Sequence, residues 1–140
     1  PLRVAHGVAG LPDAHVLGMG NPHAVLIVDD PDAAPVTTAG PMIERHPAFP
    51  ERCNVGFLAR RADRAGRPVL RQRTWERGSG ETLACGTGAC AAAVVAMCTG
   101  LIPTGPVTVV QNGGELRIDW DGQGSVHLEG EAVTVFTGDV

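Results

Sequence analysis

The chain has 140 residues and a formal net charge of −4, a length that predicts one domain with a sizeable core. Its 11 basic residues form no long run, which argues against nucleic-acid binding. No apolar run reaches the roughly 18 residues of a membrane span, and no signal pattern is present, so we expect a cytoplasmic protein.

In chain order, the sequence predicts short strands separated by glycine- and proline-rich turns. We expect a strand with turns within 1–18, and further strands at 24–28, 53–59, 69–75, 107–110, 116–120, 126–128 and 133–136. Tight turns at 65–66, 112–114 and 122–124 predict antiparallel hairpins. Because the chain begins without methionine, we expect a piece of a longer protein.

The region after the second strand contains conflicting helix signals. The acidic run at 29–32 can cap a helix. Pro35, Gly40 and Pro41 are expected to break the region up to Arg45 into short helical pieces.

Residues 88–98 differ from the rest because they contain no charged residue and almost nothing polar. Alanine, valine and methionine over about three turns predict a helix, and since every side is apolar the helix should be buried all round. We therefore predict an α+β fold in which a mostly antiparallel, barrel-like sheet wraps around one buried central helix. A doubly wound fold would need helices alternating with parallel strands, which the pattern does not indicate.

Cys85 stands where this helix begins. The first backbone N–H groups of a helix lack partners and carry partial positive charge, so we expect a lowered thiol pKa and an anion cradle there. Gly86 and Gly88 would let a ligand approach the backbone closely. The alternative is that Cys85 is a small buried residue, as free cysteines usually are.

The other cysteines give weaker signals. Cys90 and Cys98 lie inside the predicted helix, and no spacing fits a small disulfide scaffold, so we expect thiols. The spacings are not Cys-x-x-Cys and the five histidines form no matching pair, so we expect no metal.

Three stretches together resemble the diaminopimelate epimerase family: Gly20–His23, Glu51–Phe57 and Glu76–Gly88. The third is long and specific. The resemblance implies an enzyme that needs no cofactor and interconverts LL- and meso-diaminopimelate for lysine and peptidoglycan synthesis. It implies two pseudo-symmetric domains, each a sheet around a helix, with one cysteine from each domain at a helix start. Residues 1–140 resemble only the C-terminal domain.

The resemblance also implies roles for individual residues. Cys85 would be one of two catalytic thiols, with Glu76 and His23 supporting its chemistry. The substrate would be held by Asn21, Asn54, Glu76, Arg77, Gly86 and Thr87. Some of these residues could instead have purely structural roles. His23 could be an ordinary loop histidine, Glu76 and Arg77 could form a surface ion pair, and the two asparagines could bond turn backbone.

Only one of the two catalytic thiols, Cys85, has a counterpart in this chain, because no second cysteine stands in a matching motif. We therefore expect the isolated chain to be inactive and its partner to be the missing N-terminal domain. The strand expected at 132–140 would join that domain. Phe136 stands where the family usually carries a tyrosine that helps a dimer form, which leaves a homodimer open.

Other functions stay open at this point. They are another two-cysteine isomerase of the same fold (proline-racemase-like or phenazine-biosynthesis-like), a non-catalytic ligand-binding module, and a cysteine hydrolase using Cys85 and His23. Gly86-x-Gly88-x-x-Ala91 also matches a dinucleotide fingerprint, but we expect neither a strand directly before it nor a parallel βαβ unit.

Overall fold

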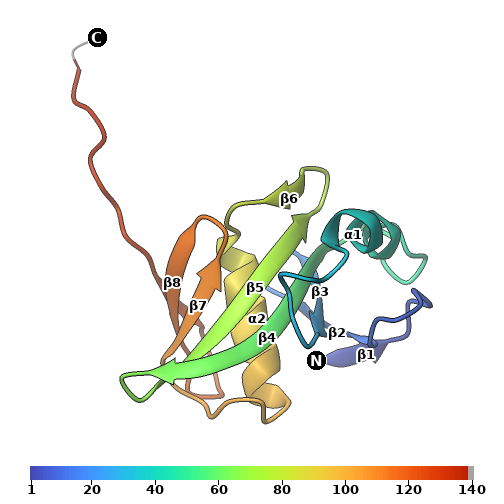
Figure 1. Cartoon of the computed structure of the whole chain (residues 1–140), viewed down its shortest axis with the longest axis horizontal. Helices are drawn as coiled ribbons and strands as arrows, with labels where there is room; N and C mark the ends of the chain where they lie inside the picture. The colour runs from blue at the N-terminus through green and yellow to red at the C-terminus, as the bar shows by residue number, and fades with distance from the viewer. Residues whose placement is uncertain (139–140) are drawn as a thin grey trace.

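The computed structural model describes residues 1–138, which form one mixed sheet and two helices (Figure 1). The helices are α1 (Val36–Glu44) and α2 (Gly86–Cys98). The strands are β1 (Leu2–Val4), β2 (Ala14–Gly18), β3 (Pro22–Ile27), β4 (Asn54–Arg64), β5 (Arg67–Glu76), β6 (Gly80–Thr82), β7 (Val107–Gln111), β8 (Gly114–Asp119) and β9 (His127–Glu129).

The sheet has the order β1-β2-β3-β4-β5-β7-β8-β9, with β6 paired to β5. Most neighbours are antiparallel, as predicted, so the α+β class is confirmed. The expectation that parallel strands are missing was wrong, because β3 pairs parallel to β4 and β5 pairs parallel to β7. α1 and α2 lie in the two connections that make these parallel pairs possible. Within residues 1–138 the order runs from β1 to β9 without joining them, so the sheet is open rather than closed.

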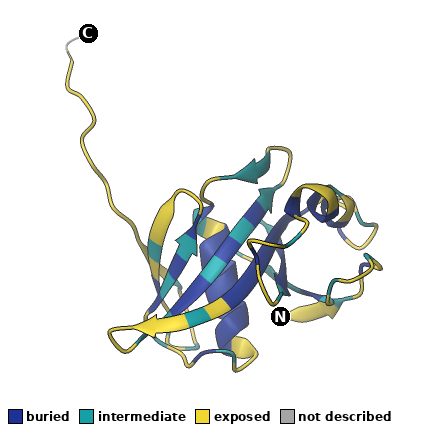
Figure 2. Ribbon diagram, viewed as in Figure 1, coloured by how far each residue is buried: buried dark blue, intermediate teal, exposed yellow. Residues whose placement is uncertain are grey.

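Helix α2 is buried at every position from Gly88 to Met97, which confirms the prediction of a helix enclosed on all sides (Figure 2). Strands β2, β3, β4, β5, β7, β8 and β9 all pack against it. Small side chains make this possible, because alanine lets strands approach the helix axis from several directions. The helix ends at Cys98 with Thr99 as its C-cap, and Gly100 follows with φ 75°, a conformation that glycine adopts readily.

Helix α1 differs from its prediction. It is one continuous helix that contains both Gly40 and Pro41, and its N-cap is Pro35 without a side-chain cap. The expected capping by the acidic run is wrong, because Asp30 and Asp32 form ion pairs with arginines of β4 and β5 instead. Tertiary packing decides the outcome: α1 buries Val36, Ala39 and Ile43 in a second apolar cluster that also contains Phe57 of β4.

The C-terminal segment also departs from its prediction. Residues 130–138 form no strand, so the expected strand at 133–136 is wrong for this sheet. The segment leaves the body of the fold (Figure 1) and exposes Val133, Val135 and Phe136. Residues 139 and 140, the end of the strand expected at 132–140, lie outside the described residues.

Neither helix within residues 1–138 has the length and apolar character that crossing a bilayer would require.

Candidate functional site

Cys85 is the N-cap of α2, with φ −140° and ψ 108°. Its backbone carbonyl accepts the first helical hydrogen bond from the Ala89 N–H, and its sulfur accepts the Gly88 N–H at 3.3 Å. The N–H groups of Gly86 and Thr87 come before the first intrahelical donor, so they have no partner within the helix. Cys85 is 8% exposed and follows the exposed Ala84, which places the sulfur just below the surface.

Two buried glutamines hold this helix start. Gln111, at the end of β7, accepts the Cys85 N–H at 2.8 Å and donates to the Cys85 carbonyl at 3.1 Å. It also donates to Gln72 of β5 at 2.8 Å, and Gln72 donates to the Gly88 carbonyl at 3.0 Å. The backbone of Cys85 is therefore held from both sides by one side chain.

The expectation of a lowered pKa for Cys85 is wrong. Burial raises the pKa of the Cys85 thiol, and the nearby Glu76 carboxylate raises it further. Hydrogen bonds from the Gly88 N–H and the Thr87 hydroxyl lower the pKa, but they do not offset the loss of water. The sequence revealed the helix terminus but not how deeply the thiol would be buried, and burial is the larger effect.

A second chain of contacts approaches the helix start from β3. The Nε2–H of the buried His23 donates to Asn21 Oδ1 at 3.0 Å, and Asn21 Nδ2 donates to the Thr87 hydroxyl at 3.4 Å. The Thr87 hydroxyl is 3.8 Å from the Cys85 sulfur. Burial and the charge of Arg77 lower the pKa of His23 to about 4, so its imidazole is neutral at neutral pH.

Glu76 and Arg77 lie where β5 ends. Glu76 accepts a hydrogen bond from the Thr82 hydroxyl across the loop that leads to Cys85. The Arg77 N–H donates to the side chain of the buried Asn54 at 2.9 Å, and its guanidinium donates to the Glu51 carbonyl. Asn54 is the register partner of His23 on the parallel β3–β4 pair. Residues far apart in sequence are thus brought to one end of the sheet. Asn54 bonds loop backbone, as the structural alternative to substrate binding predicted.

Sequence reasoning missed three residues that shape this region. Besides the glutamine pair, Glu44 at the end of α1 is buried and accepts hydrogen bonds from the Trp75 indole at 2.8 Å and the Gly78 N–H at 3.1 Å. The available signal was alternation: Gln111 continues the buried positions of β7 after Val109, and Gln72 continues those of β5 after Leu70. For Glu44 no local pattern indicates burial.

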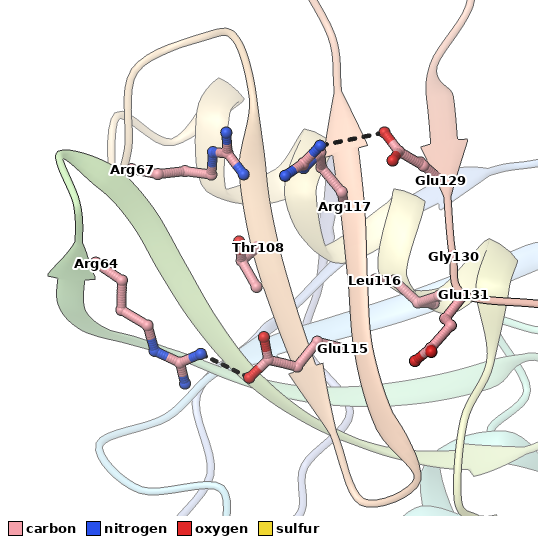
Figure 3. Close-up of a pocket in the computed structure, with 9 residues that line it drawn as sticks. All are labelled: Arg64, Arg67, Thr108, Glu115, Leu116, Arg117, Glu129, Gly130 and Glu131. Carbon is pink, nitrogen blue, oxygen red and sulfur yellow. Dashed lines mark hydrogen bonds and ion pairs between the residues drawn. The ribbon is translucent and has the colours of Figure 1, made fainter.

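Two surface hollows help to locate the site. One, of about 480 Å³, reaches the helix start; its lining includes Thr87, Cys90, Val94, Met19 and Trp120. The other, of about 410 Å³, lies over the β4–β5 hairpin, β7, β8 and β9 and contains no predicted site residue (Figure 3). Its arginines and glutamates balance in number, and Arg64–Glu115 and Arg117–Glu129 are already paired across it.

Solved structures share the fold of this chain at low sequence identity. A phenazine biosynthesis PhzC/PhzF protein from Clostridium difficile matches with a TM-score of 0.50 and 18% identity over 71% of this chain and 34% of that chain. A phenazine biosynthesis PhzF-family protein from Enterococcus faecalis gives a TM-score of 0.50 and 16% identity with the same coverage. This likeness shows the fold alone, over about a third of each matched protein.

Sequence comparison defines the family. The diaminopimelate epimerase profile matches residues 15–138. The diaminopimelate epimerase of Laribacter hongkongensis is 52% identical over 99% of this chain and 48% of that protein, and that of Chromobacterium violaceum is 54% identical over 89% of this chain and 44% of that protein. The chain belongs to the diaminopimelate epimerase family. It spans about half the length of the curated relatives it matches.

The dinucleotide reading of the same glycines does not fit the local topology. A strand, β6, does stand directly before α2, contrary to expectation. The expectation of no parallel βαβ unit was also wrong, because β5 and β7 pair parallel with α2 between them. However, the glycines follow β6, which pairs antiparallel with β5, whereas in a dinucleotide-binding unit the glycine turn leads directly from a parallel strand into the helix.

Proposed function

We propose that this chain is the C-terminal half of a diaminopimelate epimerase, and that Cys85 is one of its two acid–base thiols. One observation carries the proposal: Asn21 of the first stretch contacts Thr87 beside Cys85 at the start of α2, and Asn54 of the second stretch accepts the Arg77 N–H of the third. The family membership supplies the substrate, LL- or meso-diaminopimelate, and the reaction, inversion at one α-carbon.

The chemistry requires two groups on opposite faces of the α-carbon. A thiolate on one face takes the α-proton, the electron pair stays on the substrate, and a thiol on the other face returns a proton with inverted configuration. Cys85 supplies one of these groups, and its raised pKa suits the protonated member of the pair. The second thiol belongs to the missing half, so this chain alone does not complete the reaction.

The helix start offers the place for the substrate α-carboxylate. The N–H groups of Gly86 and Thr87 are free of intrahelical partners and aligned with the helix dipole. Their dipoles stabilise negative charge that builds on the carboxylate as the α-proton leaves. Glu76 and Arg77 suit the charged groups of a zwitterionic substrate. Asn21, bonded to the Thr87 hydroxyl, and Asn54, bonded to the Arg77 N–H, would hold the substrate with them.

The missing half also explains the exposed C-terminal segment. Val133, Val135 and Phe136 place apolar side chains in water, and we propose that residues 132–140 pair with a sheet of the other domain. The sheet here is open between β1 and β9, and contact with the other half would complete its barrel-like enclosure of α2. Whether two copies associate through Phe136 is a separate question, which the mass of the full-length protein in solution answers.

The test uses exchange of the substrate α-proton with deuterated water. The full-length protein should incorporate deuterium and interconvert the two stereoisomers, Cys85→Ala in that protein should abolish both, and the 140-residue chain alone should do neither. Turnover by the chain alone, or an unimpaired Cys85→Ala enzyme, would refute the proposal. An intact enzyme that rejects diaminopimelate but isomerises another amino acid would correct the substrate.

A further inference from the structure

The side chains of Gln72 and Gln111 occupy an unusual place. Both are buried, at 0% and 5% exposure, on the face of the sheet that packs against α2. Their strands are parallel neighbours: Arg71 pairs with Val110, and the two glutamines follow at the next position of each strand. Buried glutamines are uncommon and are retained only where their hydrogen bonds are satisfied.

The hydrogen bonds of the pair connect strands β5 and β7 to the start of α2. Gln111 uses its carbonyl oxygen for the Cys85 N–H and its amide for both the Cys85 carbonyl and Gln72. Gln72 uses its amide for the Gly88 carbonyl. These contacts hold both ends of the Cys85–Gly88 segment, the same segment in which the Gly88 N–H contacts the Cys85 sulfur.

Simple core filling does not require this arrangement. An apolar pair of the same volume would pack against α2 without any bond to Cys85, as Leu70 and Val109 do two residues earlier on the same strands. What the glutamines add is directional contact with the two ends of the Cys85–Gly88 segment. The extended backbone of the N-cap Cys85, at φ −140°, differs from the helix that follows.

We propose that Gln72 and Gln111 are positioning residues, which hold the backbone of Cys85 so that its sulfur stays against the Gly88 N–H and beside the free N–H groups of Gly86 and Thr87. The role as a positioning pair for catalysis rests on the proposed function. The physical claim, that the pair sets the environment of the thiol, does not depend on it.

The test measures the reaction of Cys85 with iodoacetamide as a function of pH. The exposed Cys98 is replaced by serine to remove the accessible competitor. Because the chain has no lysine or arginine between Gly78 and Arg117, trypsin yields one peptide that carries Cys85 and Cys90, and fragmentation assigns the label. Gln111→Met and Gln72→Met remove the hydrogen bonds while keeping a side chain of similar length, and Gln123→Met makes the same change in an exposed loop.

The proposal predicts a graded result. Gln111→Met should speed labelling of Cys85 at neutral pH by about tenfold, because the released sulfur becomes accessible to the reagent. It should also move the midpoint of the pH profile downward, because relief of burial, the largest cause of the raised pKa, outweighs loss of the Gly88 N–H contact. Gln72→Met should do the same to a smaller extent, since both bonds from Gln111 to Cys85 remain. Gln123→Met should stay within about twofold of the unchanged chain.

A purely structural role gives a different result. The variants would unfold at lower urea concentration, yet below their unfolding transition the pH profile of Cys85 would match that of the unchanged chain, and this would overturn the proposal. If Gln111→Met fails to fold, Gln72→Met decides: an unchanged profile overturns the proposal and a shifted profile supports it.

A parallel assay separates this inference from the proposed function. In the full-length protein, Gln111→Met should lower kcat by about tenfold while changing KM much less, because it misplaces a reacting group rather than a binding group. If the unmodified full-length protein shows no epimerase activity, the proposed function fails, whereas the labelling result still decides whether the glutamines control the thiol.

Discussion

The stability of this protein should fall on mild acidification, and His23 should be the main cause. Its imidazole is buried and faces the charge of Arg77, and these two effects lower its pKa to about 4 from the ordinary 6.5. The unfolded chain therefore binds this proton at a higher pH than the folded chain. Stability is fully present above about pH 6.5 and is lost as the pH falls toward about 4.

The size of the effect follows from the two pKa values. The gap between 6.5 and about 4 corresponds to about 3 kcal/mol of unfolding free energy at full titration, and about 2 kcal/mol of this is lost between about pH 7 and about pH 5. The carboxylates of Asp30, Asp32 and Glu44 do not contribute in that range, because their pKa values are lowered and they titrate below it.

The assay is equilibrium unfolding in urea at about pH 7 and about pH 5, followed by the fluorescence of Trp75 and Trp120. Burial also lowers the pKa of His15, so His15→Gln serves as the background in both arms. In that background, His23→Gln removes the titrating group and keeps an amide that can donate to Asn21. The reasoning is refuted if the chain carrying His23→Gln loses as much stability between the two pH values as the chain that retains His23.

Three further predictions concern packing and thiols. Gly40→Ala should lower the unfolding free energy by about 2 kcal/mol in urea titrations despite the roughly 1 kcal/mol that alanine adds to a helix, because its Cβ would lie 2.6 Å from Trp75 Cγ; an unchanged or raised midpoint contradicts this. Glu44→Gln should cost about 2 kcal/mol in the same titration, since the Trp75 indole loses a charged acceptor, and a neutral outcome would show that the charge is dispensable. In thiol titration with Ellman's reagent, the exposed Cys98 should react first and Cys53 only on unfolding, because burial raises the pKa of Cys53 to about 12; early reaction of Cys53 in folded protein would contradict its placement.

The features that sequence predicted well are those with a strong local signal. The run from Gly88 to Cys98 has no polar face, so burial on every side was the only favourable outcome for a helix there. The β4–β5 hairpin could likewise be predicted, because Gly66 favours the positive φ that its tight turn needs. Both predictions depend on residues close together in the chain.

The features that sequence missed depend on contacts between distant residues. Nothing local shows that β5 pairs with β7 across α2, although that pairing places Gln72 beside Gln111. The continuity of α1 through Pro41 is decided by burial against β4, which outweighs the cost of a missing helical hydrogen bond. Family motifs located Cys85 and its neighbours, but they carried no information on burial, and burial set the thiol pKa.

The raised pKa of Cys85 fits the proposed chemistry better than the lowered one expected at a helix start. An epimerase that inverts a centre with two thiols needs one of them protonated when the other takes the α-proton, so two strongly acidic thiols would both be ionised and neither could donate. At Cys85, burial and Glu76 favour the proton, whereas the Gly88 N–H and the Thr87 hydroxyl favour the thiolate. When the thiol gives up its proton, hydrogen-bond donors are therefore already in place to stabilise the thiolate. A proton donor of this kind should be alkylated slowly in the isolated chain.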